Sequence, residues 1–191
     1  MKLGLKKISK NLLGLASATA ITLSATHTVA ADSDYILATA STGGTYYPVG
    51  VAIATLSKIK LEPKHGISLS AISSAGSGEN VKLLRENQAQ FAILQGLYGA
   101  GAWNGEGRVA NSGKQEGLRS ISMLWQNVEH FVLKSDLVKS GTVADLTQLE
   151  KGNNKFSIGK KNSGTEGSGR QLLSGLGIDA AKFSLAHMGY G

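Results

Sequence analysis

Three segments rich in glycine and hydroxyl side chains contain the residues of this chain best suited to bind an anion. They are residues 41–46 (Ser-Thr-Gly-Gly-Thr-Tyr), residues 73–78 (Ser-Ser-Ala-Gly-Ser-Gly) and residues 162–165 (Asn-Ser-Gly-Thr). The start of a helix presents unpaired N–H groups and a partial positive charge. Glycine lets a ligand approach the backbone, and Ser and Thr add donors. One such segment alone is more typical of a helix cap, but three together predict an anion site with little side-chain charge.

No motif in the sequence indicates catalysis or a resident metal. The chain has no cysteine, which excludes disulfides, thiol nucleophiles and Cys-ligated metals. Residues 159–165 lack the Lys of a phosphate-binding loop, and His65, His130 and His187 belong to no HExxH pattern. No Ser lies in a Gly-x-Ser-x-Gly nucleophile elbow. We therefore expect no catalytic residue, no metal site and no cofactor.

Apolar periodicity predicts strands that alternate with helices, an order typical of parallel α/β sheets. We expect strands at residues 35–40, 67–72, 91–94, 120–125, 130–133 and 156–158. We expect helices at residues 46–60, 79–87 and 143–149, and a last one that contains Leu172, Leu173 and Leu176 and ends at Gly177. Residues 104–117 are polar and predict a surface loop. Trp125 is expected in the core, with a ligand platform as the alternative. Ligands of such sheets bind outside the carboxyl ends of the strands, where the three segments would lie.

Residues 1–31 have the order of a secretory signal peptide. Four lysines among the first ten residues precede an uncharged apolar stretch, and small residues then predict cleavage near Ala30 or Ala31. The apolar stretch is too short to span a bilayer. Without those four, 16 of the 20 Lys and Arg residues remain against 13 Asp and Glu. The remaining basic residues are scattered, so a nucleic-acid partner is not expected.

Residues 41–48 (STGGTYYP) closely resemble the opening of the TAXI family, the solute receptors of one branch of the tripartite ATP-independent periplasmic (TRAP) transporters. The resemblance continues through residues 76–81 (GSGENV), 91–95 (FAILQ), 143–146 (VADL) and 162–165 (NSGT). It covers nearly all of the chain after residue 31. Asn162 departs from the pattern, because the family usually has Gly there.

The resemblance implies the type II periplasmic-binding-protein fold, with two α/β domains that enclose a solute in a cleft. The first domain would comprise residues 32–126 and the second residues 127–191, with residues 125–130 as the hinge. Family members continue for about another domain's length beyond the equivalent of Gly191. We therefore expect the second domain to be incomplete and the chain to be partial or truncated.

The resemblance also implies a non-enzymatic periplasmic receptor. It would capture a small anionic solute, an acidic amino acid or a dicarboxylate, and deliver it to a TRAP-type permease, its only link to the membrane. The ligand-binding residues carried over from the family are Ser41, Thr42, Gly43, Thr45, Tyr46, Ser77, Gln95, Ser163, Gly164 and Thr165. Three other functions stay open: a binding protein of an ATP-driven importer, an exported enzyme on a similar scaffold, and a surface interaction protein without a transported ligand.

Overall fold

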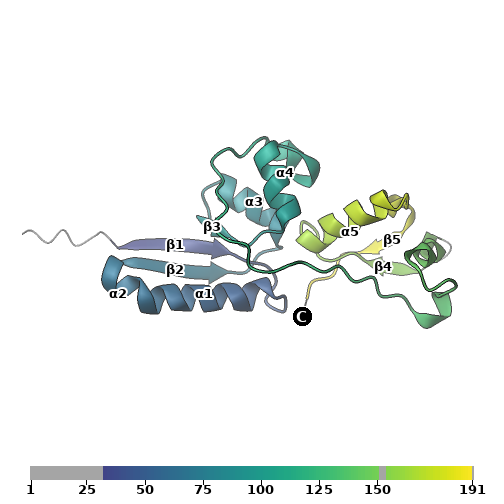
Figure 1. Ribbon diagram of the computed structural model, residues 1–191, viewed down its shortest axis with the longest axis horizontal. Coiled ribbons are helices and arrows are strands. Elements are labelled where there is room, and N and C mark those ends of the chain that lie inside the picture. Colours follow the sequence, from purple (N-terminus) through teal and green to yellow (C-terminus); the bar gives the residue numbers. More distant parts are fainter. Residues whose placement is uncertain (1–31, 151–153, 191) are drawn as a thin grey trace, which may run out of the picture.

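Two parallel sheets organise the chain in a computed structural model that describes residues 32–150 and 154–190 (Figure 1). The larger sheet has three strands in the order β2-β1-β3, and the smaller sheet pairs β4 with β5. The strands are β1 (Ser33–Ala38), β2 (Ile67–Ile72), β3 (Phe91–Ala92), β4 (Lys155–Ser157) and β5 (Ser184–Ala186). Every pair is parallel, so the predicted α/β class with parallel sheets is confirmed. The expected signal peptide lies outside the described residues.

Helices cover both faces of the larger sheet (Figure 1). Helix α1 (Tyr46–Lys60) and the short α2 (Glu62–His65) lie on one face, and α3 (Ser77–Arg85) and α4 (Gly96–Asn104) lie on the other. Because β1 is the central strand, the connections from β1 to β2 and from β2 to β3 cross the sheet in opposite directions. Right-handed crossings in opposite directions place their helices on opposite faces. Three layers result, and α1, α3 and α4 begin at the edge where the strands end.

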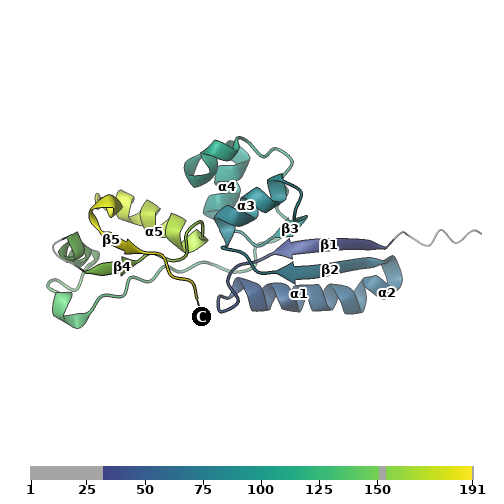
Figure 2. The ribbon, with the colours of Figure 1, turned by 180° about the vertical axis from the view of Figure 1, so that it is seen from behind.

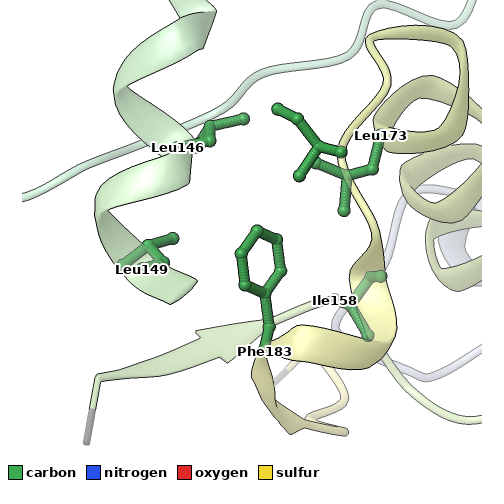
Figure 3. Close-up of a cluster of buried hydrophobic side chains, with 6 residues drawn as sticks. Leu146, Leu149, Ile158, Leu173 and Phe183 are labelled. Carbon is green, nitrogen blue, oxygen red and sulfur yellow. The ribbon is translucent and has the colours of Figure 1, made fainter. Parts of the chain in front are cut away.

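The smaller sheet has an apolar core of its own (Figure 3). Its helical elements are η2 (Ser135–Leu137), η3 (Val143–Glu150), α5 (Gly164–Gly175) and η4 (Ala180–Lys182). Leu146 and Leu149 of η3 face Leu173 of α5 across this core, and the Phe183 ring lies among them beside Ile158. These buried side chains hold η3 and α5 to the sheet.

Three helical segments differ from the sequence prediction. Helix α4 was not predicted, because the glycines at positions 96, 99 and 101 interrupt its apolar pattern. Tyr98 and Ala102 nevertheless bury against α3. The polar segment expected as a loop contains η1 (Gly107–Ser112). Residues 143–149 form the 3-10 segment η3 rather than an α-helix.

An extended segment, residues 120–133, connects the larger sheet to the smaller one (Figure 2). We expected strands at 120–125 and 130–133, and this prediction is wrong, because none of the described residues forms a strand there. Ile121, Met123 and Val132 keep the alternating apolar pattern but are largely exposed. A ladder needs a second strand beside the first, and no described strand lies there. The predicted boundary between two domains, near residue 126, falls inside this segment and stays a prediction.

No helix in the described part of the chain is long and apolar enough to cross a bilayer.

The Asp145 carboxylate organises the turn that leads into η3. It accepts hydrogen bonds from the backbone N–H groups of Lys139, Ser140 and Gly141 at 2.8–3.0 Å, and from the Ser140 hydroxyl at 2.8 Å. The Ser140 N–H contributes most, and these bonds together outweigh desolvation and lower the pKa of Asp145 to about 2. Donors aimed at a carboxylate favour its charged form. The turn therefore depends on Asp145 being ionised.

We expect the stability of this protein to fall in acid partly through Asp145. A carboxyl group whose pKa is lower in the folded than in the unfolded chain stabilises the fold above its unfolded pKa. That stabilisation is lost as the pH falls from the ordinary value of 3.8 towards about 2. Asp145→Asn should lower the free energy of unfolding at pH 7 and flatten its dependence on pH below 4, measured by urea denaturation. Asp136→Asn, at an exposed position, is the control, and an equally steep pH dependence in Asp145→Asn would contradict this role.

Candidate functional site

The loops that follow β1, β2, β3 and β4 meet at one pocket of about 310 Å³. Each loop leads directly into a helix, so α1, α3, α4 and α5 all begin at this pocket. The four residues that precede these helices, Thr45, Gly76, Gln95 and Ser163, all line it. In Figure 1, α1 and α5 both begin near the centre of the molecule. Four helix N-termini from both sheets therefore share one space, outside the carboxyl ends of the strands as the fold class predicts.

The structure brings together nine of the ten residues expected to bind a ligand. The pocket is lined by Ser41, Gly43, Thr45, Tyr46, Ser77, Gln95, Ser163, Gly164 and Thr165. Thr42 is exposed and does not belong to the lining. Lining residues from the larger sheet and from the turn before α5 thus meet at one pocket, although they are far apart in the sequence.

Four polar or aromatic residues of the pocket lining were not among the expected binding residues: Trp125, Asn127, Lys160 and Tyr190. The expectation that Trp125 lies in the core is wrong, because it is 39 % exposed and meets the Tyr46 ring edge to face at 5.7 Å between centroids. Tyr190 forms a hydrogen bond with the Thr165 hydroxyl. None of the four lies at the start of a helix, the feature from which the sequence predicts binding residues. Lys160 stands beside Gly159 in the turn before α5, and its position in that turn could have identified it.

A buried amide behind the pocket ties three of the loops together. The Asn80 side chain is fully buried and donates from Nδ2 to the backbone oxygens of Thr39 at 2.7 Å and Ile93 at 2.9 Å. Its Oδ1 accepts from the Ser74 hydroxyl at 2.6 Å. A fully satisfied buried network of this kind makes its surroundings rigid. Asn80 therefore positions the pocket without touching it, and its place inside residues 76–81 is the sequence signal for it.

The turn before α5 lies directly against the starts of α3 and α4. The Gly78 N–H donates to the Asn162 carbonyl at 3.0 Å, and the Tyr98 hydroxyl donates to the Ser163 carbonyl at 3.0 Å. A Cβ on Gly78 would lie only 2.7 Å from the Asn162 oxygen. Asn162 itself has a φ of +65°, a left-handed conformation that Gly and Asn adopt most readily. An Asn where the TAXI family usually has Gly is therefore compatible with this turn.

The Glu166 carboxylate, 3 % exposed, lies at the start of α5. It accepts from the Asn162 N–H at 2.8 Å and from Arg170 Nε at 3.0 Å, and it pairs with Arg108 of η1 at 3.6 Å. Burial raises the pKa of Glu166, but the Asn162 N–H and the two guanidinium groups outweigh burial and hold this pKa below its usual value. Because two cations surround this one anion, the cluster behind α5 carries a net positive charge.

The pocket wall itself carries one charged side chain among the described residues, Lys160, and no carboxylate. Burial raises the pKa of the Tyr46 phenol, while a hydrogen bond with Ser77 opposes the shift, so Tyr46 is a neutral donor or acceptor there. Within residues 32–150 and 154–190, no group of three His, Asp or Glu side chains is arranged to hold a metal. The arrangement is suited to an oxygen-rich anion held by N–H groups, hydroxyls and one ammonium group.

Gln95 is the one described residue whose buried side chain has an unsatisfied polar atom. Its side chain is 9 % exposed, lines the pocket, and has no hydrogen-bond partner for Oε1. A buried polar group without a partner costs about 1–3 kcal/mol. The amide plane can turn about its last bond, so either its oxygen or its nitrogen can face the pocket. A ligand that donates a hydrogen bond to this oxygen would recover that cost, whereas a carboxylate, which only accepts, can bond to the amide nitrogen alone.

A model of the NMT1-like family matches residues 37–191. The match contains all four helix starts at the pocket, together with Lys160 and Tyr190. Proteins of this family have a periplasmic-binding-protein-like fold and are typically not enzymes. They bind a small solute for a transporter and are usually extracytoplasmic. Because the match spans most of the chain, this protein belongs to the NMT1-like family.

Proposed function

We propose that this protein is a periplasmic receptor that captures a small anionic solute and delivers it to a TRAP-type permease. The solute would be an acidic amino acid or a dicarboxylate. The observation that carries the proposal is the pocket where four helix N-termini meet beside Lys160, with no carboxylate among its described lining residues. The resemblance of residues 41–48 to the TAXI receptors supports the TRAP-type partner, and the signal-like order of residues 1–31 supports export.

Helix N-termini suit this solute class for a physical reason. The first N–H groups of a helix have no partner within the helix, and the aligned peptide dipoles place a partial positive charge at the same end. A carboxylate satisfies both, and the Thr45, Ser77 and Thr165 hydroxyls add donors at the same wall. The positive Arg108–Glu166–Arg170 cluster behind α5 favours an anion further.

The pocket also suggests how capture would change the receptor. Its wall comes partly from the larger sheet and partly from the turn before α5 in the smaller one. A solute that contacts both parts of the wall binds more tightly when the two parts are close together. Binding therefore favours the closed conformation over the open one. We propose that residues 125–130 act as the hinge, since they lie in the extended segment between the two sheets.

Thr45→Ala tests this proposal most directly. Thr45 precedes α1, but its side chain caps no backbone N–H, whereas the Ser163 hydroxyl accepts from the Glu166 N–H at 3.1 Å. Thr45→Ala should therefore weaken the binding of L-glutamate or 2-oxoglutarate by roughly tenfold, the usual effect of losing one hydrogen bond to a charged group. Its unfolding midpoint without solute should be unchanged. Affinity would be measured by isothermal titration calorimetry.

Thr42→Ala is the matched control, because it removes the same hydroxyl from an exposed residue three positions earlier that does not line the pocket. It should bind as tightly as the wild type. Equal losses in Thr42→Ala and Thr45→Ala would contradict the placement of the solute at the α1 start. No binding of any acidic amino acid or dicarboxylate by the wild type would contradict the proposed solute class.

A further inference from the structure

Lys160 is the one charged side chain among the described residues that line the pocket. It stands in the turn between β4 and α5, on the same wall as Ser163, Gly164 and Thr165. The part of the wall contributed by the larger sheet is polar but uncharged. The pocket therefore has two kinds of anion-binding feature: helix starts with hydroxyls, and a single ammonium group.

The other cations near the smaller sheet are not available in the same way. Arg108 and Arg170 both pair with the buried Glu166 carboxylate behind α5, and neither lines the pocket. Lys161 follows Lys160 directly in the sequence but does not line the pocket either. A second negative charge on the solute would thus have Lys160 as its counter-ion.

The Gln95 amide is an independent sign that a ligand belongs here. It is nine-tenths buried, lies in the pocket wall and has an oxygen without a partner. A Cβ on Gly164 would lie only 2.8 Å from that oxygen, so the amide adjoins the start of α5. The Lys160 turn and the starts of α1 and α3 come from different sheets, so a solute that spans the pocket can present one end to each.

We propose that Lys160 selects solutes with a second carboxylate over those with one. This inference rests on the proposed function. The helix starts and hydroxyls bind the first carboxylate through neutral donors, and the Lys160 ammonium group pairs with the second. Lys160 is exposed in this structure. If the pocket closes around the solute, the second carboxylate loses water, and the ammonium group compensates for that loss. An uncharged amide in its place gains little from the ammonium group, so the charge of that end determines the preference.

The experiment compares two solute pairs that differ only in that end: L-glutamate with L-glutamine, and glutarate with its monoamide. Dissociation constants would be measured by calorimetry for the full chain and for Lys160→Met, Lys160→Arg and Lys161→Met. The wild type should prefer the dicarboxylate member by roughly tenfold. Lys160→Met should remove this preference by weakening dicarboxylate binding alone, while Lys160→Arg should keep it. Lys161→Met should keep it as well, because that side chain is outside the pocket.

Three results would overturn the inference, and they are distinguishable. Equal losses of the dicarboxylate preference in Lys160→Met and Lys161→Met would show that it arises from the overall positive charge of the protein and not from a contact with Lys160. Binding of both members with equal affinity, unchanged in Lys160→Met, would remove the selectivity and leave the receptor function standing. Failure of the wild type to bind any of the four solutes would overturn the proposed solute class, and this inference with it.

Discussion

Replacing Gly164 by Ala is expected to weaken solute binding by roughly tenfold, about 1.4 kcal/mol, because the added methyl group would displace the Gln95 amide from its place in the pocket wall. A Cβ at this position would lie 2.7 Å from Gln95 Cδ and 3.0 Å from the Ser77 hydroxyl oxygen. The Gln95 amide, as the end of a flexible side chain, can yield only by moving from its present position beside α5. Calorimetric titration of L-glutamate and 2-oxoglutarate would measure the loss.

The stability of Gly164→Ala should change much less than its affinity. Gly164 is the first residue of α5 and does not have a positive φ, so the backbone accepts alanine without strain. Gly96→Ala is the matched control, because Gly96 is the first residue of α4 and its Cβ would meet no described atom within 4 Å. It should bind the solute normally. Normal affinity in Gly164→Ala would show that the solute does not approach the start of α5.

Replacing Gly167 by Ala is expected to lower the free energy of unfolding by about 1–3 kcal/mol. A Cβ there would lie 2.2 Å from the Tyr98 hydroxyl oxygen and 2.6 Å from the ring carbon that carries it. Tyr98 is buried in the core beside α3, and its hydroxyl also bonds to the Ser163 carbonyl. The ring therefore has little freedom to move, and α5 would be displaced from α4. Urea denaturation would measure the effect.

Gly175→Ala makes the same chemical change on the same helix at a site with no described atom within 4 Å. It should stabilise the protein by about 0.5–1 kcal/mol, since alanine favours helices more than glycine. In the background of Tyr98→Ala, Gly167→Ala should destabilise far less than it does alone, because the clashing ring is gone. Additive effects of the two substitutions would contradict a direct contact between them.

The elements of the larger sheet could be predicted from local pattern. Residues 46–60 and 67–72 were expected as a helix and a strand with the bounds that α1 and β2 have in the structure. The pattern identifies α1 but not its buried face, because Gly50, Ala54 and Ser57 are buried while Leu56 and Ile59 are 58 % and 60 % exposed. Residues 120–125 and 130–133 have a pattern of the same quality, but a strand also needs a partner, and a partner is not a local property. Helix α4 was not predicted for the opposite reason. Its three glycines have low helix propensity, but the burial of Tyr98 outweighs it.

The sequence predicts the part of the candidate site that lies at the starts of helices. Hydroxyl- and glycine-rich turns after strands identified the residues of three of the four converging loops, and the resemblance added Gln95 from the fourth. Thr42 shows the limit, because the spacing of residues 41–46 does not determine which side chains turn inwards. Trp125, Asn127 and Tyr190 come from segments whose course depends on how the two sheets lie together. No local pattern in the sequence carries that information.

The turn of residues 159–165 has consequences for how the specificity of this protein could evolve or be redesigned. Asn162, Ser163 and Gly164 are constrained on both sides, because their backbones contact α3 and α4 while they also line or support the pocket wall. Lys160 takes part in the turn through its carbonyl, which accepts from the Ser163 N–H at 3.0 Å. Any residue at position 160 supplies that carbonyl, and any residue except proline at position 163 supplies the N–H. Position 160 can therefore accept new side chains while the geometry of the turn is preserved, and under the proposed role of Lys160 a single substitution there would change the accepted solute.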